Sequence, residues 1–206
     1  MNTQNQKKLG KAVREQGGLT PSNGKMTDLV FDPVTGDFVV KDKDAELNEG
    51  EMVVTEMTNN GFAAKVGQMT PERFEAEKRV LEQFLPQNAY LFKDDLLLLA
   101  AKTNSGNIYT IWIELKDFPN KPEAGVTKML KDKDGIDMGC CSSYMHTLTT
   151  RHGGTTICHY GDSWTPMVSL YKVYIKCRLW LEMYELHLET GKTIDYYLKH
   201  DNHDES

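Results

Sequence analysis

The chain has 206 residues, of which 39% are hydrophobic and 26% charged, so it can fold around a sizeable core. Its formal net charge of -6 argues against nucleic-acid binding, because phosphate contacts need clustered lysine and arginine. No run of 18 apolar residues occurs and residues 1–8 are polar, so we expect neither a membrane span nor a secretory signal. Four cysteines are too few for a disulfide framework, and we expect reduced thiols in a cytoplasmic protein.

The N-terminal part of the chain divides into two segments. Residues 1–25 are polar and rich in Gln, Asn, Lys and Gly, which predicts a flexible segment. Residues 26–69 predict a small β-rich appendage, because two β-rich runs flank a turn at residues 33–36 and indicate a hairpin. Weaker strand patterns follow within residues 51–57 and 62–66. The thin apolar content of this appendage argues against independent folding.

A second domain is predicted over residues 70–199, beginning with a helix. Thr70-Pro71-Glu72 is a strong helix start, and Pro86 ends the helix. An antiparallel meander follows, with a turn at Asn104-Ser105-Gly106-Asn107. Its strands are predicted at residues 90–92, 96–101 and 108–115. Phe118-Pro119-Asn120-Lys121-Pro122 then forms a rigid extended loop.

The rest of the chain predicts an irregular region and a long helix. Residues 123–153 are polar and contain glycine, so we expect loops there. After Pro166 the pattern is helical to about Thr190, and Gly191 suits the helix end. One apolar face is expected, formed by Leu170, Val173, Cys177, Leu181, Tyr184 and Leu188. The polar residues 200–206 predict a flexible tail.

Cys158 is the strongest candidate for chemistry. It ends a β-type run just before a polar turn, where a thiol can be both oriented and accessible. The alternative is a small buried hydrophobic residue, since free cysteine is among the most buried residue types. We expect Cys177 to be of that second kind, because it falls on the apolar face of the long helix.

The order of these motifs resembles the ubiquitin-conjugating enzyme family, and most closely its bacterial members. Phe118-Pro119-Asn120-Lys121-Pro122 is similar to the family's Tyr-Pro-x-Lys-Pro-Pro segment. Gly154-Thr155-Thr156-Ile157-Cys158 and Trp164-Thr165-Pro166 are similar to its Gly-x-Ile-Cys active-site run and its Trp-Ser-Pro turn. Trp180-Leu181-Glu182-Met183-Tyr184-Glu185 resembles a run in the bacterial helix. The resemblance covers roughly residues 70–191.

This resemblance implies an α+β, ubiquitin-conjugating-enzyme-like fold. It consists of an N-terminal helix, a four-stranded antiparallel meander, an active-site loop and a long C-terminal helix, here preceded by the small β appendage. One departure concerns the His-Pro-Asn segment of eukaryotic members, upstream of the cysteine. His146 loosely matches its histidine, but the Pro and Asn are absent. The group that stabilises an oxyanion therefore stays unassigned.

The resemblance also implies a function for Cys158. The thiol would accept an activated protein C-terminus as a thioester and transfer it to an amine or a partner, with no cofactor. The implied partners are an activating-type enzyme and either a ubiquitin-like protein or the C-terminus of a nucleotidyltransferase, within a ubiquitin-like conjugation or antiphage operon. One alternative is a non-catalytic binding module of the same fold that docks a ubiquitin-like or immune-signalling partner. Another is an unrelated thiol enzyme, such as a Cys-His hydrolase.

Three further residues are candidates for catalysis beside Cys158. His159 and His152 could lower the pKa of the thiol or shuttle a proton, although in a strand His159 would point away from its neighbour. Asp162 could orient or deprotonate an incoming lysine. Each of the three has a plain alternative as an ordinary strand, surface or turn residue.

Cys140 and Cys141 are adjacent in the expected loop region. A disulfide between neighbours strains the peptide, so they remain open to interpretation as a loop thiol pair, a redox site or half of a metal site. The spacing of the nearby cysteines and histidines matches no standard zinc pattern, and we expect no metal.

Overall fold

The computed structural model describes residues 7–11, 13, 27–42, 45–48, 50–53, 69–160 and 164–198. The predicted tail at residues 200–206, the strand pattern at residues 62–66 and the candidate Asp162 lie outside these ranges, as does most of the segment 1–25. Within that segment, residues 7–11 and 13 are helical, and Leu9 and Val13 are buried.

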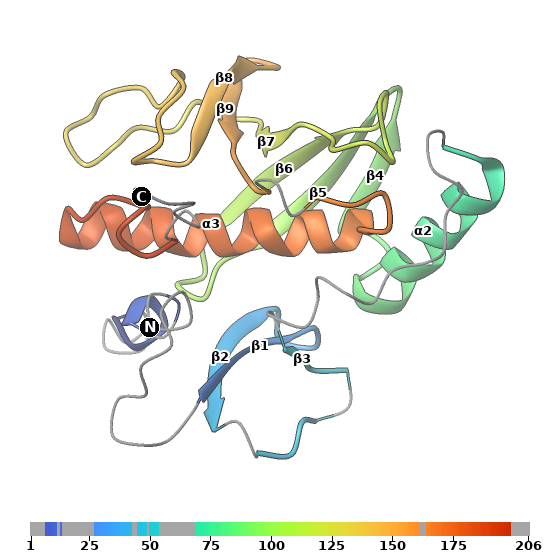
Figure 1. The fold of residues 1–206 in the computed structure, drawn as a ribbon, viewed down its shortest axis with the longest axis horizontal. Coiled ribbons are helices and arrows are strands. Elements are labelled where there is room, and N and C mark those ends of the chain that lie inside the picture. Colours follow the sequence, from blue (N-terminus) through green and yellow to red (C-terminus); the bar gives the residue numbers. More distant parts are fainter. Residues whose placement is uncertain are drawn as a thin grey trace, which may run out of the picture.

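A six-stranded antiparallel sheet forms the largest layer of the molecule (Figure 1). Its strand order is β4-β5-β6-β7-β9-β8. The strands are β4 (Tyr90–Lys93), β5 (Leu96–Lys102), β6 (Ile108–Glu114), β7 (Ala124–Val126), β8 (Thr147–Arg151) and β9 (Gly154–Ile157). The mixed helix and sheet content confirms the α+β class, and β4 to β7 form an antiparallel meander that β9 and β8 extend.

Alternation of buried and more exposed side chains explains why β5 and β6 form where the sequence predicts strands. Leu97, Leu99 and Ala101 on β5 are fully buried, whereas the residues between them are more exposed. Ile111 and Ile113 on β6 pair with Leu99 and Leu97, so both strands direct apolar side chains to one face of the sheet.

The expectation of an irregular region at residues 123–153 was wrong for β7 and β8, which lie within it, while residues 127–146 between them form no helix or strand of the sheet. β7 has only three residues, too few to show a period of two. Its Gly125 is required by close packing, since a Cβ there would lie 2.3 Å from the Thr155 carbonyl oxygen and 2.8 Å from Trp112. β8 is rich in threonine, a β-branched residue that favours strands.

Helix α2 (Pro71–Phe84) starts as the sequence predicts. The Thr70 side chain accepts a hydrogen bond from the Arg73 N–H at 3.2 Å, and Pro71 occupies the first turn. The buried side of the helix is partly polar, because Arg73 and Glu77 are buried together with Leu81. α2 therefore contributes a buried ion pair as well as apolar side chains to the interior.

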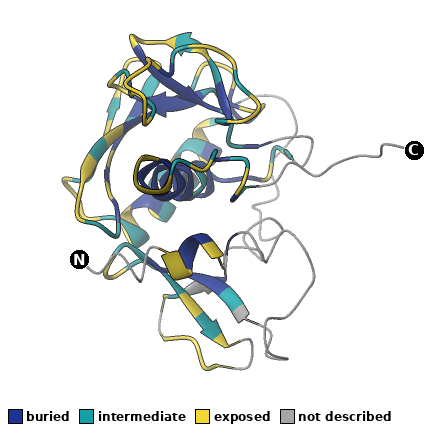
Figure 2. Cartoon of the chain, turned by 90° about the vertical axis from the view of Figure 1, so that its left-hand side faces the viewer, coloured by how far each residue is buried: buried dark blue, intermediate teal, exposed yellow. Residues whose placement is uncertain are grey.

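Helix α3 (Leu170–Thr190) is the centre of the molecule rather than a helix with one apolar face. Its residues 170–187 are all buried except the intermediate Lys176, and Leu188, expected on the apolar face, is 44% exposed. Ser169 caps the start through its side chain, and Gly191 ends the helix in the left-handed conformation with φ of 71°. Figure 2, viewed along the helix, shows buried ribbon with layers on both sides.

The second layer is a small antiparallel sheet of order β2-β1-β3, on the side of α3 away from the large sheet (Figures 1 and 2). It consists of β1 (Thr27–Asp32), β2 (Asp37–Asp42) and β3 (Met52–Val53), so the predicted hairpin is confirmed. Phe31 of β1 meets Tyr171 of α3 edge to face at 6.4 Å. Leu29, Phe31 and Phe38 belong to the same hydrophobic cluster as α3 and the large sheet.

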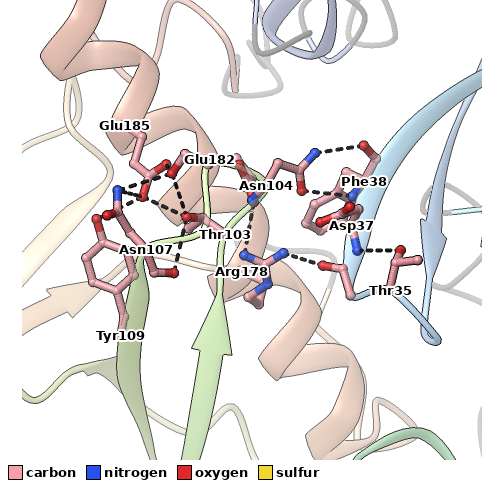
Figure 3. Close-up of polar contacts among 12 residues, drawn as sticks. Thr35, Asp37, Phe38, Thr103, Asn104, Asn107, Tyr109, Arg178, Glu182 and Glu185 are labelled. Atoms are coloured by element: carbon pink, nitrogen blue, oxygen red, sulfur yellow. Dashed lines mark hydrogen bonds and ion pairs between the residues drawn. The ribbon is translucent and has the colours of Figure 1, made fainter. Parts of the chain in front are cut away.

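Polar side chains of α3 also hold this small sheet and the β5–β6 turn (Figure 3). Arg178 donates to the Gly36 carbonyl oxygen at 2.5 Å and to Glu182 at 2.9 Å. The Asn104 side chain bonds both the N–H and the carbonyl of Phe38, at 3.1 and 2.9 Å. Glu185 accepts hydrogen bonds from the side chains of Thr103, Ser105, Asn107 and Tyr109.

No helix in the described ranges combines the length and the apolar character needed to cross a membrane.

Candidate functional site

Cys158 follows β9 directly and is half-buried. Its N–H donates to the His146 carbonyl oxygen at 2.8 Å, just beyond the β8–β9 pair Thr147↔Ile157. Because β9 lies between β7 and β8, the main chain leading into Cys158 is fixed on both sides. Cys177, by contrast, is fully buried in α3, which confirms its predicted place in the core.

The chain after Cys158 is held by the proline loop, residues 118–122. His159 Nε2 donates to the Pro122 carbonyl oxygen at 2.9 Å, and Trp164 Nε1 donates to that of Pro119 at 3.2 Å. In the opposite direction, Lys121 Nζ donates to the Tyr160 carbonyl oxygen at 2.7 Å. The proline loop therefore has a structural role, as a support for the residues that follow the cysteine.

Helix α2 holds the segment that leads into α3. The Arg73 guanidinium donates to the carbonyl oxygens of Pro166 and Val168, both at 2.9 Å. Glu77 accepts the Leu170 N–H at 2.7 Å and pairs with Arg73 at 2.6 Å. The described residues between Cys158 and α3 are thus anchored first by the proline loop and then by a buried ion pair.

His159 is held as a neutral imidazole. Burial lowers its pKa to about 4, and the nearby charges of Lys121 and Lys176 act in the same direction. Because the Pro122 carbonyl can only accept, the hydrogen must be on Nε2, which leaves Nδ1 with a lone pair that is shielded from solvent and without a partner in the described structure. A neutral ring cannot stabilise a thiolate by charge, so the contacts of His159 are those of a positioning residue.

His152 is not brought to Cys158. It lies at the β8–β9 turn with φ of 50°, and its ring packs edge to face on Trp112 at 4.6 Å. Cys158 lies at the other end of the hairpin, beyond β9 (Gly154–Ile157), and four strand residues span roughly 13 Å. The ring of His152 covers Trp112 instead of assisting the thiol. Asp162, the remaining candidate, lies outside the described residues.

The structure places one pair near Cys158 that the sequence did not predict. The buried His146 donates from Nε2 to Asp195 Oδ1 at 3.0 Å, and the same residue provides the carbonyl that holds the Cys158 N–H. His146 carried a weak motif signal, but Asp195 lies 37 positions after Cys158 and carried none. Only the folded chain shows that the two meet.

Cys140 and Cys141 are exposed and unpaired by disulfide. The Cys140 carbonyl oxygen accepts from the Thr147 hydroxyl at 2.7 Å, so this segment lies along β8. Among the residues that the structure describes, no group of three or more His, Cys, Asp or Glu side chains is arranged to hold a metal ion.

No protein-family model, no curated protein and no solved structure matches the chain. The resemblance to ubiquitin-conjugating enzymes therefore stays a prediction. The geometry itself offers a half-buried thiol at a strand end, with supported main chain on either side, which suits covalent acyl chemistry.

Proposed function

We propose that the chain is a bacterial ubiquitin-conjugating-like enzyme that carries an activated protein C-terminus as a thioester on Cys158. The observation that carries the proposal is the position of this thiol. It is half-buried at the end of β9, with its N–H bonded to His146 and the following residues bonded to the proline loop. The motif order and the α+β architecture around one long helix support the same proposal.

The chemistry consists of two acyl transfers. The Cys158 thiolate attacks the thioester carbonyl that the activating-type enzyme presents, and the thiolate of that enzyme leaves. An amine then attacks the Cys158 thioester, an amide forms, the Cys158 thiolate leaves, and the amine loses a proton to solvent or to a nearby base. The attacking atom, sulfur in the first step and the amine nitrogen in the second, must come within about 3–3.5 Å of the carbonyl carbon, so fixed main chain on each side of the thiol is useful.

Other side chains have supporting roles in this proposal. His159 positions the residues after the cysteine while it stays uncharged near neutral pH, because its pKa is about 4. Asp162 is kept as the candidate that deprotonates the incoming amine. His152 has no part, since it lies at the far end of the β8–β9 hairpin. The scheme uses no cofactor.

The proposed partners follow from the same reaction. An activating-type enzyme delivers the acyl group, and a ubiquitin-like protein or a nucleotidyltransferase C-terminus is the group delivered. We place the protein in the cytoplasm, in a ubiquitin-like conjugation or antiphage operon. Reduced thiols suit that compartment.

The experiment is acylation of the full chain by a synthetic peptide α-thioester, followed by intact-mass and peptide mass spectrometry. We expect one acyl group on Cys158 that hydroxylamine removes, no acyl group at position 158 in Cys158→Ala, and an unchanged result in the matched variant Cys177→Ala. Acylation confined to the exposed Cys140 and Cys141 would overturn the proposal, because it would show chemistry governed by exposure alone.

A further inference from the structure

We propose that Asp195 is a positioning residue for Cys158 and acts through His146. This inference rests on the proposed function and adds a residue to it. The link has two bonds: His146 Nε2 donates to Asp195 Oδ1 at 3.0 Å, and the His146 carbonyl oxygen accepts the Cys158 N–H at 2.8 Å. A carboxylate from the segment after α3 is thereby connected to the main chain of the reactive cysteine.

The loop that carries His146 is fixed at three successive carbonyl groups. The Tyr144 carbonyl accepts the Asp195 N–H at 2.9 Å, and that of Met145 accepts Trp180 Nε1 at 3.0 Å. The third, from His146, accepts the Cys158 N–H. Asp195 holds this loop twice, once through its main chain and once through its carboxylate.

The backbone of His146 explains why the loop needs the carboxylate. His146 has φ of 48°, in the left-handed region that non-glycine residues adopt at a cost and keep only where their surroundings fix them. Its side chain is 9% exposed, so the imidazole cannot replace a lost partner fully with water. The bond to Asp195 both pairs the buried ring and holds the strained residue in place.

The consequence for catalysis is geometric. Without the carboxylate, His146 can relax toward an ordinary backbone conformation, and its carbonyl moves relative to the Cys158 N–H. A displacement of about 1 Å at a reacting group can cost on the order of 100-fold in rate. The loss is expected in the acyl-transfer step, since the link from Asp195 reaches the Cys158 main chain through His146.

The test compares Asp195→Ala, Asp195→Asn and a matched control, Tyr197→Phe. The asparagine keeps an oxygen that can accept from His146 Nε2. The control removes a 2.8 Å hydrogen bond between Tyr197 and Thr190, which involves neither His146 nor Cys158. The readout is the rate of Cys158 acylation at several concentrations of a peptide α-thioester, in chains with Cys140→Ser and Cys141→Ser, together with thermal unfolding.

We expect Asp195→Ala to lower the maximal acylation rate at least about tenfold with little change in the half-saturating concentration. Asp195→Asn should recover most of the loss, and Tyr197→Phe should match the parent chain. Equal rates in Asp195→Ala and the parent overturn the inference, as does an equal loss in Tyr197→Phe, which would indicate general anchoring of the segment. If Asp195→Ala does not fold, Asp195→Asn must match the parent for the inference to stand. No acylation of the parent chain at Cys158 overturns the proposed function itself, and with it the role given to Asp195.

Discussion

The four cysteines occupy three distinct environments, and this difference decides which sulfur can react. Cys177 is fully buried in α3, and burial raises its pKa, so it is held as an inert thiol. Cys140 and Cys141 are exposed, and bonds of the flanking Gly139 and Ser142 to β8 hold their main chain. Cys158 differs from them because it is half-buried and directly follows a strand that is paired on both sides.

Alkylation of the native protein should reproduce this order. With iodoacetamide at pH 8, we expect Cys140, Cys141 and Cys158 to be modified at least roughly 100-fold faster than Cys177, because a buried neutral thiol presents no thiolate to the reagent. Peptide mass spectrometry at successive times gives the four rates, and unfolding in urea should equalise them. Fast labelling of Cys177 in the native protein would contradict the structure.

The buried pair Arg73–Glu77 should stabilise the fold more than an exposed ion pair does. Removing one charge leaves the other buried without a partner, so Arg73→Ala should lower the free energy of unfolding by about 3 kcal/mol. Lys78→Ala is the matched control, since it breaks the exposed pair Lys78–Glu75 and should cost less than about 0.5 kcal/mol. Urea unfolding measures both, and equal effects would show that the buried pair is no more important than the surface one.

Helix α3, like α2, carries charged residues on a buried surface. Arg178, Glu182 and Glu185 lie at i, i+4 and i+7, where they meet the β1–β2 turn and the β5–β6 turn. Glu182 accepts from Arg178 and from the Asn104 N–H through one oxygen, while its other oxygen has no partner in the described structure. Arg178, Glu182 and Glu185 therefore connect α3 with the β1–β2 turn and the β5–β6 turn.

The pH dependence of stability should report on Glu182. Burial raises its pKa from 4.5 to about 7, against the opposing charge of Arg178, while Glu185 raises it further. The folded state therefore binds this proton more tightly than the unfolded state. The contribution of Glu182 to stability is largest below about pH 4.5 and falls as pH rises to about 7, by up to roughly 3 kcal/mol.

Glu182→Gln should remove this slope, because the amide does not titrate. We expect the parent chain to lose more stability than Glu182→Gln between pH 5 and pH 8 in urea unfolding, with the exposed Glu82→Gln behaving as the parent. Asp37 of β2 and Glu77 of α2, whose pKa values burial also raises, contribute to the slope that remains. Parallel pH curves for the parent and Glu182→Gln would contradict the assignment.

For the molecule as a whole, the small sheet and the large sheet share one core through α3. Phe31 contacts Phe38 within the small sheet and Tyr171 on the helix. A chain with one continuous core is expected to unfold in one transition. The small sheet should therefore be needed for the stability of residues that lie far from it in sequence.

Phe31→Ala tests this coupling. It should lower the free energy of unfolding by about 3–5 kcal/mol in a single transition, seen equally by circular dichroism and by tryptophan fluorescence. All three tryptophans, Trp112, Trp164 and Trp180, lie outside the small sheet. Val34→Ala, at a side chain that is 85% exposed, is the control and should cost less than about 0.5 kcal/mol. An unchanged fluorescence transition in Phe31→Ala would show two independent units.

Short sequence patterns were sufficient to predict those elements that a cap or a side-chain alternation defines. The start of α2 follows from Thr70 and Pro71, and the alternation in β5 and β6 follows from their side chains. Strand β7 was not predicted, because three residues, one of them Gly125, show no periodicity. The burial of α3 on all sides was not predicted, because its charged residues suggest a solvent-exposed face. The structure shows that these residues pair with two turns instead.

The candidate site likewise combines residues that a local motif identifies with contacts that only the fold brings together. Cys158 and His159 were identified from a local run, but the roles of the histidines depend on contacts between distant segments. The Pro122 carbonyl fixes the tautomer of His159, and the ring of His152 packs on Trp112. Asp195 meets His146 across 49 positions, a contact that no local pattern contains. Geometry of this kind comes from the packing of the whole chain.

The decisive measurement is formation of a thioester with the proposed partners. The full chain is incubated with ATP and with a candidate activating enzyme and ubiquitin-like protein, then resolved with and without dithiothreitol. The account predicts an adduct that dithiothreitol cleaves for the parent chain, a dithiothreitol-resistant ester for Cys158→Ser, and none for Cys158→Ala. An adduct of equal amount in Cys158→Ala and the parent chain would contradict it.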